Sequence, residues 1–182
     1  MRRRSAKKWR PDAVGHDLVV TLLEAGAAAP NHHLTRPWRF TVFTGDSRQA
    51  LGDALAASVH RSLRTEDEAL LAVLEARARN KVLEAPVIIT VSVVPSNAPK
   101  VREAEELHAG AAAAQNILVA AEALGLAALW RSGDAAFDDS VKAFLGLPAG
   151  AHVIGFLYLG WPEDAARSVK RDPSAAALTD WR

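Results

Sequence analysis

The residue types best suited to chemistry stand together at Arg131, Ser132 and Gly133. A guanidinium and a hydroxyl supply hydrogen-bond donors, and a glycine lets a ligand approach the backbone closely. The apolar run Leu126–Trp130 predicts a short strand, preceded by a helix of small residues that ends at Gly125. This strand would deliver the three residues into a loop, where they could form the floor of a site for a planar, hydrogen-bonding ligand.

A second chemical feature is the cationic N-terminus. Residues 1–11 carry the terminal amine and six basic side chains, which are Arg2, Arg3, Arg4, Lys7, Lys8 and Arg10. One interpretation is a solvated basic tail. The other is an anion site, because arginine binds phosphate oxygens in a bidentate way. Composition alone leaves both interpretations open.

Other catalytic arrangements are missing from the sequence. The six histidines form no HExxH motif, no serine lies in a GxSxG elbow, and there is neither a Walker loop nor a GxGxxG motif. The chain has no cysteine, which excludes disulfides, thiolate metal sites and cysteine nucleophiles. Any redox chemistry must therefore come from a bound cofactor, and no metal is expected.

Size and charge narrow the class of protein further. The chain has 182 residues and a formal net charge of +1, from 22 basic and 21 acidic side chains. This balance argues against a basic-tailed nucleic-acid module, the least favoured interpretation of the N-terminus. No apolar run has the length of a membrane span, and no apolar segment follows the basic start as in a signal peptide. We expect no nucleic-acid or membrane partner and a cytoplasmic location.

Hydrophobic periodicity predicts the elements that would position these residues. Helices are expected from Asp12 or Asp17 to about Ala25, with Gly26 as the stop, at 48–63, at 66–84, at Glu103–Leu124 and after a cap at Asp138. Strands are expected at Trp38–Thr44, at Ala85–Val94, before Arg131, and at His152–Gly160.

Two of these elements carry more specific expectations. Ala85–Val94 is continuously apolar, which is typical of a central strand buried on both faces. Gln115 and Asn116 interrupt the small residues of the longest helix and are expected to be satisfied buried polar groups. Strands interleaved with helices indicate an α+β fold, with a mixed central β-sheet flanked by helices in a single domain over residues 1–182.

Five segments follow one another in the order of a known family. They are RRSAKKW (3–9), EAGAAAPNHHLTRPWRFTVF (24–43), EAPVIITV (84–91), AAAAQNILVAAEALGLAALWRSG (111–133) and VIGFLYLGWPE (153–163). Through this ordered set the chain resembles the FMN-dependent nitroreductase family, and most closely its short YdjA-like NAD(P)H nitroreductase branch. The resemblance implies the nitroreductase-like fold and a homodimer with two FMN sites at its interface.

The resemblance also assigns cofactor-binding positions. Arg3, Arg4 and Ser5 match the family's N-terminal flavin-binding triplet, and His32 matches a residue that reaches the flavin of the other subunit. Arg131, Ser132 and Gly133 match the loop that meets the isoalloxazine ring. Lys170 and Arg171 resemble a basic pair that meets the FMN phosphate. The segment matching the nicotinamide nucleotide site is Ala121, Glu122, Ala123, Leu124, Gly125 and Leu126.

The activity implied is that of an FMN-dependent NAD(P)H oxidoreductase. NADH or NADPH would give a hydride to the flavin, and a small-molecule acceptor such as a nitroaromatic or a quinone would take the electrons. No catalytic acid or base is expected, because the flavin carries the chemistry. A cation beside the N1–C2=O edge would stabilise the anionic reduced flavin, and Arg131 or an N-terminal arginine suits that role.

The alternative is an FMN-binding or carrier protein of the same fold with little turnover. Two departures from the family pattern favour it. Relatives usually have a helix before the Arg-Arg-Ser triplet that contributes to the dimer, so a weaker dimer, or a different start of the chain, is one expectation. Relatives also have a basic flavin contact where this chain has Ala28, so weaker flavin binding is expected unless Arg36, Lys170 or Arg171 compensates.

Overall fold

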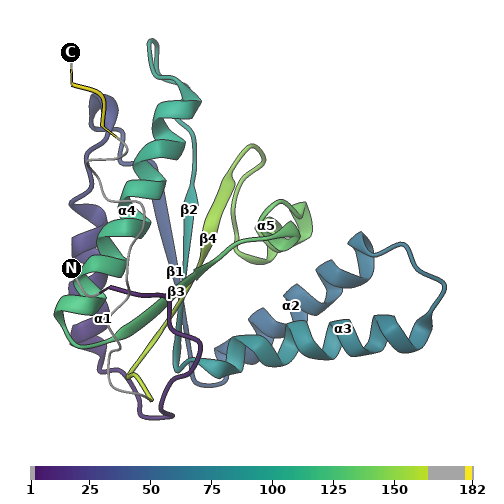
Figure 1. Cartoon of the computed structure of the whole chain (residues 1–182). Coiled ribbons are helices and arrows are strands. Elements are labelled where there is room, and N and C mark those ends of the chain that lie inside the picture. The colour runs from purple at the N-terminus through teal and green to yellow at the C-terminus, as the bar shows by residue number, and fades with distance from the viewer. Residues whose placement is uncertain (1–2, 164–178, 182) are drawn as a thin grey trace.

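A four-stranded sheet forms the centre of the molecule (Figure 1). In the computed structural model, which describes residues 3–163 and 179–181, the strands pair in the order β1-β2-β4-β3. Their bounds are β1 (Trp38–Thr44), β2 (Val87–Val93), β3 (Ala127–Arg131) and β4 (His152–Gly160). All three pairings are antiparallel. The predicted α+β class is confirmed, whereas the mixed character of the sheet is limited, within the described residues, to one parallel bridge between Ser5 and Ala128.

Strand β2 is the central strand that the sequence predicts. Every one of its residues is buried, because helices cover both faces of the sheet and a strand flanks it on each side. The strand begins two residues later than its apolar run, at Val87. Pro86 precedes it and has no amide proton to donate to a neighbouring strand.

Helices α1 (His16–Ala27) and α4 (Glu103–Ala123) cover one face of the sheet (Figure 1). Gly26 does not end α1 as predicted, because the helix continues to Ala27. A Cβ at Gly26 would lie 3.0 Å from Ile117 of α4 and from Phe40 of β1, so the glycine allows close packing instead. The predicted caps are also wrong, since the N-cap is Gly15 rather than Asp12 or Asp17.

The two polar residues in the middle of α4 have different environments. Asn116 is half-buried, and its side-chain amide donates a hydrogen bond to the carbonyl of Ala25 at 3.1 Å, which joins α4 to α1. Gln115 is exposed, so the prediction of a buried amide is wrong for this residue. None of the described helices combines the length and apolar character needed to cross a membrane.

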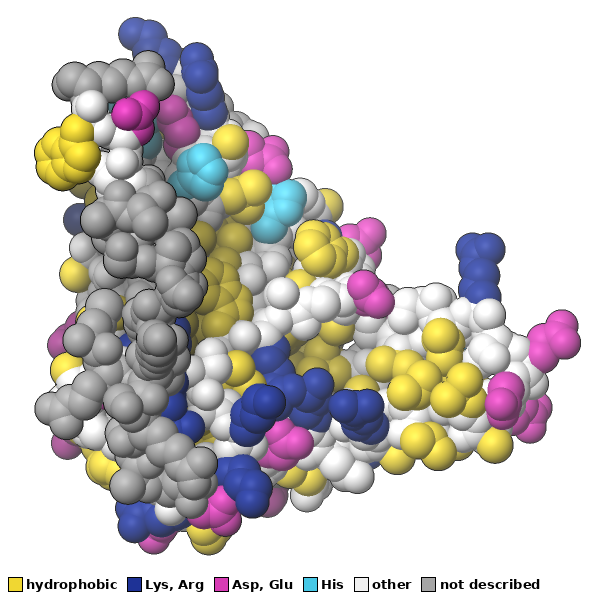
Figure 2. Space-filling view, in the orientation of Figure 1, with side chains coloured by type: hydrophobic (Ala, Val, Ile, Leu, Met, Phe, Trp, Pro, Cys, Tyr) yellow, Lys and Arg dark blue, Asp and Glu magenta, His cyan; other side chains and the backbone are white. Residues whose placement is uncertain are grey.

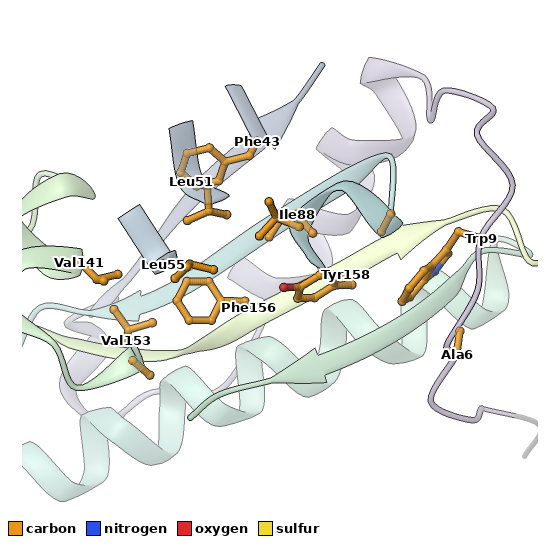
Figure 3. Close-up of a cluster of buried hydrophobic side chains, with 13 residues drawn as sticks. Ala6, Trp9, Phe43, Leu51, Leu55, Ile88, Val141, Val153, Phe156 and Tyr158 are labelled. Carbon is orange, nitrogen blue, oxygen red and sulfur yellow. The ribbon is translucent and has the colours of Figure 1, made fainter. Parts of the chain in front are cut away.

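The opposite face carries the second core (Figure 3). Leu51 and Leu55 of α2 (Ser47–Ser62) pack there with Phe156 and Tyr158 of β4. Helix α5 (Asp139–Phe144) adds Val141. Helix α3 (Glu68–Lys81) has no buried residue and pairs with α2 in a hairpin that projects from the body (Figure 1). Short 3-10 turns complete the chain: η1 (His32–Leu34), η2 (Val82–Glu84) and η3 (Asp134–Ala136).

The N-terminal segment is part of this second core rather than a solvated tail. Ala6 and Trp9 are only 4% and 7% exposed. The amide of Ala6 donates to the carbonyl of Ala128 at 3.0 Å, and the indole Nε1 of Trp9 donates to the carbonyl of Ala127 at 2.9 Å. The segment is therefore not a free tail, because Ala6 and Trp9 fix it along the edge of β3, while the side chains of Lys7, Lys8 and Arg10 are exposed.

Asp138 fastens the loop after β3 to helix α2. Its carboxylate caps α5 by accepting from the amide of Ser140 at 2.7 Å, and it accepts from Arg61 at 2.9 Å. Burial acts to raise the pKa of this carboxyl, but hydrogen bonds from Ser58, Ser140 and Arg61 outweigh it and lower the pKa to about 2. The folded state thus prefers the ionised form.

Asp138→Asn is expected to lower the free energy of unfolding by about 2 kcal/mol at neutral pH. A depressed carboxyl pKa stabilises the fold above the ordinary value of 3.8 and loses that effect as the pH falls toward about 2. The difference in free energy of unfolding between variant and wild type, measured by urea titration, should therefore disappear as the pH falls from 3.8 to about 2. Asp139→Asn is the control, because the Asp139 side chain is 95% exposed. A stability difference that does not change with pH would contradict a stabilising role for the ionised Asp138 carboxylate.

Candidate functional site

The site forms where β3 ends. Side chains alternate along a strand, so Trp130 faces α4 while Arg131 faces the α2–α3 hairpin. The Arg131 guanidinium lies over the Tyr158 ring, with 4.8 Å from its carbon to the ring centroid. Ser132 follows the strand and lines cavities on both sides of it. The end of β3 therefore gives one short stretch of chain access to both faces of the sheet.

The first cavity lies on the α4 side and has a volume of about 370 Å³. It brings the N-terminal segment to the loop after β3, as both were predicted to share a ligand. Its lining residues are Arg3, Ser5, Gln115, Leu118, Trp130 and Ser132. Arg4 is half-buried but does not line it. The donors here are a guanidinium, hydroxyls and an amide, a set suited to phosphate and sugar oxygens.

The second cavity lies on the opposite side and is strongly cationic. It has a volume of about 470 Å³ and is lined by Lys7, Arg77, Lys81, Glu84, Leu129 and Arg131. Figure 2 shows basic side chains gathered at the base of the α2–α3 hairpin. Glu84 accepts from Nη2 of Arg131 at 3.1 Å. Among the described residues, no carboxylate pairs with the other three cations, which leaves this cavity with excess positive charge.

The third cavity adjoins both others and has a volume of about 380 Å³. It shares Arg77, Lys81 and Arg131 with the second cavity, and Ser132 with the first. The rest of its lining is mostly apolar and comes from Leu55, Val59, Leu63, Leu74, Ala78, Ala135, Phe156 and Tyr158, with Ser62 and Asp134. The three cavities therefore meet at Arg131 and Ser132.

Two features of the loop suit a planar ligand that accepts hydrogen bonds. The Nε of Arg131 is buried without a hydrogen-bond partner among the described residues, and such a donor costs about 1–3 kcal/mol when left unsatisfied. Gly133 has a φ of +109°, which favours glycine, and nothing lies within 4 Å of the place where its Cβ would be. The backbone at Gly133 therefore borders open space, two residues after the unsatisfied Nε of Arg131.

Tyr158 adds a neutral hydroxyl to the third cavity. Burial raises the pKa of its phenol to about 12, with the Arg131 charge opposing the shift and the Glu84 charge adding to it. The O–H therefore stays protonated throughout the physiological range. Sequence reasoning missed this residue, because the single tyrosine of the chain stands within an apolar strand and gives no local signal.

The cations of the second cavity were missed for a different reason. The local sequence around Arg77 and Lys81 is typical of a solvated, charged helix face, and Lys7 is one member of a basic run. Their spacing of four residues places Arg77 and Lys81 on one side of α3. Only the packing of the hairpin against the sheet shows that this side faces Arg131.

His32 lies elsewhere in the same chain. Its Nδ1 is 2.8 Å from a carboxylate oxygen of Glu105, in the first turns of α4, and its side chain is 55% exposed. Gln115 of the first cavity is ten residues further along that helix, which is about 15 Å. One subunit therefore does not bring His32 into the cavities at Arg131. Its hydrogen bond contributes to lowering the pKa of Glu105.

The predicted nucleotide segment lies at the other end of β3. Ala121 and Leu126 are 0% and 3% exposed and belong to the core, whereas Ala123 and Gly125 are exposed and Glu122 and Leu124 are half-buried. Five residues of extended chain separate Leu126 from Arg131, which is about 16 Å. Residues 121–126 and residues 131–133 therefore lie at opposite ends of β3. Lys170 and Arg171 lie outside the described residues.

Comparisons with known proteins place the chain in a family. The model of the nitroreductase family matches residues 1–161. The Escherichia coli K12 protein named "Putative NAD(P)H nitroreductase YdjA" is 31% identical over 161 residues, which are 88% of this chain and 85% of that protein. YfhC of Bacillus subtilis, which bears the same description, is 26% identical and covers 98% of this chain and 90% of its own.

Solved structures agree with these matches. A nitroreductase-like protein from Bacillus cereus superposes with a TM-score of 0.85 at 27% identity, over 100% of this chain and 92% of its own. A nitroreductase-type protein from Desulfovibrio desulfuricans, solved in complex with FMN, gives a TM-score of 0.75 at 29% identity, over 100% and 93% of the two chains. The family model covers most of the sequence and the fold agrees throughout, so the chain belongs to the nitroreductase family.

Proposed function

We propose that this chain is an FMN-dependent NAD(P)H oxidoreductase that reduces a nitroaromatic, a quinone or a similar small acceptor. The observation that carries the proposal is the meeting of three cavities at Arg131 and Ser132, in a chain of the nitroreductase family. The D. desulfuricans relative is solved in complex with FMN, and the name of the E. coli relative describes an NAD(P)H nitroreductase. When bound, FMN supplies the hydride transfer between the nucleotide and the acceptor.

The residues present fit FMN. Arg3 and Ser5 would hold the phosphate and ribityl end in the first cavity, because a guanidinium and a hydroxyl match their oxygens. The open backbone at Gly133 and the unsatisfied Nε of Arg131 would meet the hydrogen-bonding part of the ring. Arg4 and the pair Lys170 and Arg171 remain proposed phosphate ligands on the family resemblance.

Arg131 and Lys7 would stabilise negative charge at the N1–C2=O edge of the ring. Both line the second cavity. One charge at about 4 Å in a partly buried site is worth on the order of 4 kcal/mol before desolvation is subtracted. Glu84 offsets part of the Arg131 charge at 3.1 Å, so Lys7 supplies the unpaired charge. This arrangement favours reduction without any side-chain acid or base.

The proposed unit is a homodimer in which His32 approaches the flavin of the other subunit. Its exposed side chain lies outside the cavities of its own subunit, and Glu105 holds it at 2.8 Å. Residues 121–126 remain a proposed nucleotide contact. Hydride transfer requires the reacting atoms to be about 3–3.5 Å apart, so a segment about 16 Å from Arg131 would bind a part of NAD(P)H other than its nicotinamide ring.

Steady-state turnover separates the reductase from the alternative, a flavin carrier of the same fold. Loaded with FMN, the protein is expected to consume NADH or NADPH when menadione is present, and each cycle converts NAD(P)H, a proton and the quinone into NAD(P)⁺ and the hydroquinone. Protein stripped of FMN should not do so and should recover when FMN is added. Protein that retains FMN but consumes neither nucleotide would be the carrier, which Ala28 favours.

A further inference from the structure

The third cavity is apolar at one end and cationic at the other. Its apolar walls include Val59 of α2, Leu63 directly after that helix, Leu74 of α3 and Phe156 of β4. A volume of about 380 Å³ is within the range of small-molecule sites, and apolar walls with a few polar groups are typical of them. Figure 2 shows a similar arrangement on the surface of the α2–α3 hairpin, where apolar side chains lie along the helices and basic side chains lie at the base.

The cationic end is not neutralised by the described residues. Arg77 and Lys81 have no ion-pair partner among them, and Asp134 is the one carboxylate that lines the cavity. Leu74, Arg77 and Lys81 follow one another at three- and four-residue spacing, so they occupy one side of α3. A molecule lying along this side would have its apolar part at Leu74 and its polar end between the two cations.

We infer that this cavity is the acceptor subsite and that Arg77 selects aromatic acceptors carrying an anionic group. The inference rests on the proposed function, because the cavity adjoins the place of the flavin ring at Arg131 and Ser132. An aromatic ring fills the apolar end, and its carboxylate pairs with the Arg77 guanidinium, which has no ion-pair partner among the described residues. A neutral acceptor of the same shape lacks this charge-assisted hydrogen bond and binds more weakly.

The same helix provides a matched control for Arg77. Arg79 is two residues further along α3 and points to α2, where its Nε lies 2.6 Å from the carboxylate of Asp53. It lines none of the three cavities at Arg131. Arg77→Gln and Arg79→Gln therefore remove the same charge from the same helix, but only the first removes it from the cavity.

The experiment compares 4-nitrobenzoate with 4-nitrobenzamide, which has the same shape without the charge. Each turnover consumes one NAD(P)H and one proton, and yields the nitroso compound and water. Wild type is expected to favour the benzoate in kcat/KM by about 10-fold or more, the size of one charge-assisted hydrogen bond. Arg77→Gln should remove that preference, mainly through KM for the benzoate, while Arg79→Gln should keep it.

A binding measurement separates this inference from the proposed function. Calorimetric titration of 4-nitrobenzoate into FMN-loaded protein, without nucleotide, is expected to show binding that weakens about 10-fold in Arg77→Gln and is unchanged in Arg79→Gln. If this pattern holds but neither compound is reduced, the subsite stands and the reductase proposal fails. Equal affinity for the two compounds in wild type, or equal losses in the two variants, would overturn the subsite.

Discussion

Arg131→Ala is expected to weaken flavin binding by about 10- to 100-fold, since a hydrogen bond to a charged group contributes about 1.5–3 kcal/mol. The substitution removes the buried Nε donor and the guanidinium that lies over Tyr158. It also leaves Glu84 facing the second cavity without its partner at 3.1 Å, which adds unfavourable negative charge beside the ring. Quenching of flavin fluorescence during titration of the stripped protein measures the affinity.

Riboflavin shows which end of the cofactor Arg131 contacts. If Arg131 meets the ring, the variant loses affinity for riboflavin and FMN by the same factor. Arg131→Lys serves as a second variant, because it keeps the charge and loses the guanidinium fork. It should recover part of the affinity. A loss confined to FMN would instead place Arg131 at the phosphate, and unchanged affinity for both flavins would remove it from the site.

Gly155→Ala is expected to destabilise the protein by about 1–3 kcal/mol or more, the usual cost of overpacking a filled core. The added Cβ would collide with the indole Nε1 of Trp130, and would lie 2.7 Å from the backbone oxygen of Arg131. Trp130 cannot move without breaking the hydrogen bond from its Nε1 to the carbonyl of Ile154 at 3.2 Å. Because Trp130 lines the first cavity, flavin affinity should fall as well.

Gly15→Ala is the control for this substitution. Nothing lies within 4 Å of the Cβ position at Gly15, so thermal unfolding of that variant should match wild type. Combining Gly155→Ala with Trp130→Ala removes the collision with the indole but not the contact with the Arg131 oxygen, so it is expected to recover part of the stability lost and none of the flavin affinity. If Gly155→Ala unfolds at the temperature of wild type and binds flavin normally, the close packing of β4 against Trp130 is not required.

The strands were predictable because their signal is local. β1 and β4 have the predicted bounds, since each run of β-branched, aromatic and aliphatic residues ends at a turn or glycine. Gly26 shows where local signals no longer suffice. A glycine that ends a helix and one that lets two helices approach look alike in the sequence, and only the contact with Ile117 distinguishes them for Gly26.

The candidate site was predictable in part, for the same reason. Recognisable residue types stand at Arg131, Ser132 and Gly133 and at the N-terminal Arg3 and Ser5. The structure places Arg131 at the end of β3 rather than in the predicted loop, and Ser132 is the residue of the three that lines one cavity with Arg3 and Ser5. The cations of the α2–α3 hairpin depend on packing between elements far apart in the chain. Arg77 in the cavity beside Arg131 and Arg79 in an ion pair with Asp53 have the same local sequence signal.

Burial of the N-terminal segment also required long-range information. Six basic side chains in the first eleven residues indicate a solvated tail as readily as a binding segment. Trp9 shows that the segment packs on the sheet, because its ring stacks with Tyr158 at a centroid distance of 6.1 Å and its Nε1 donates to the carbonyl of Ala127. Neither partner lies within a hundred residues of Trp9 in the sequence.

Titration of the FMN-loaded protein with NADH and then NADPH in the absence of air measures the proposed chemistry most directly. The yellow absorption of the flavin should bleach as nucleotide is added and return when menadione or 4-nitrobenzoate is supplied, and Arg131→Ala should bind too little flavin to show this. A protein that holds FMN firmly, but whose flavin neither nucleotide bleaches, would contradict the proposed oxidoreductase.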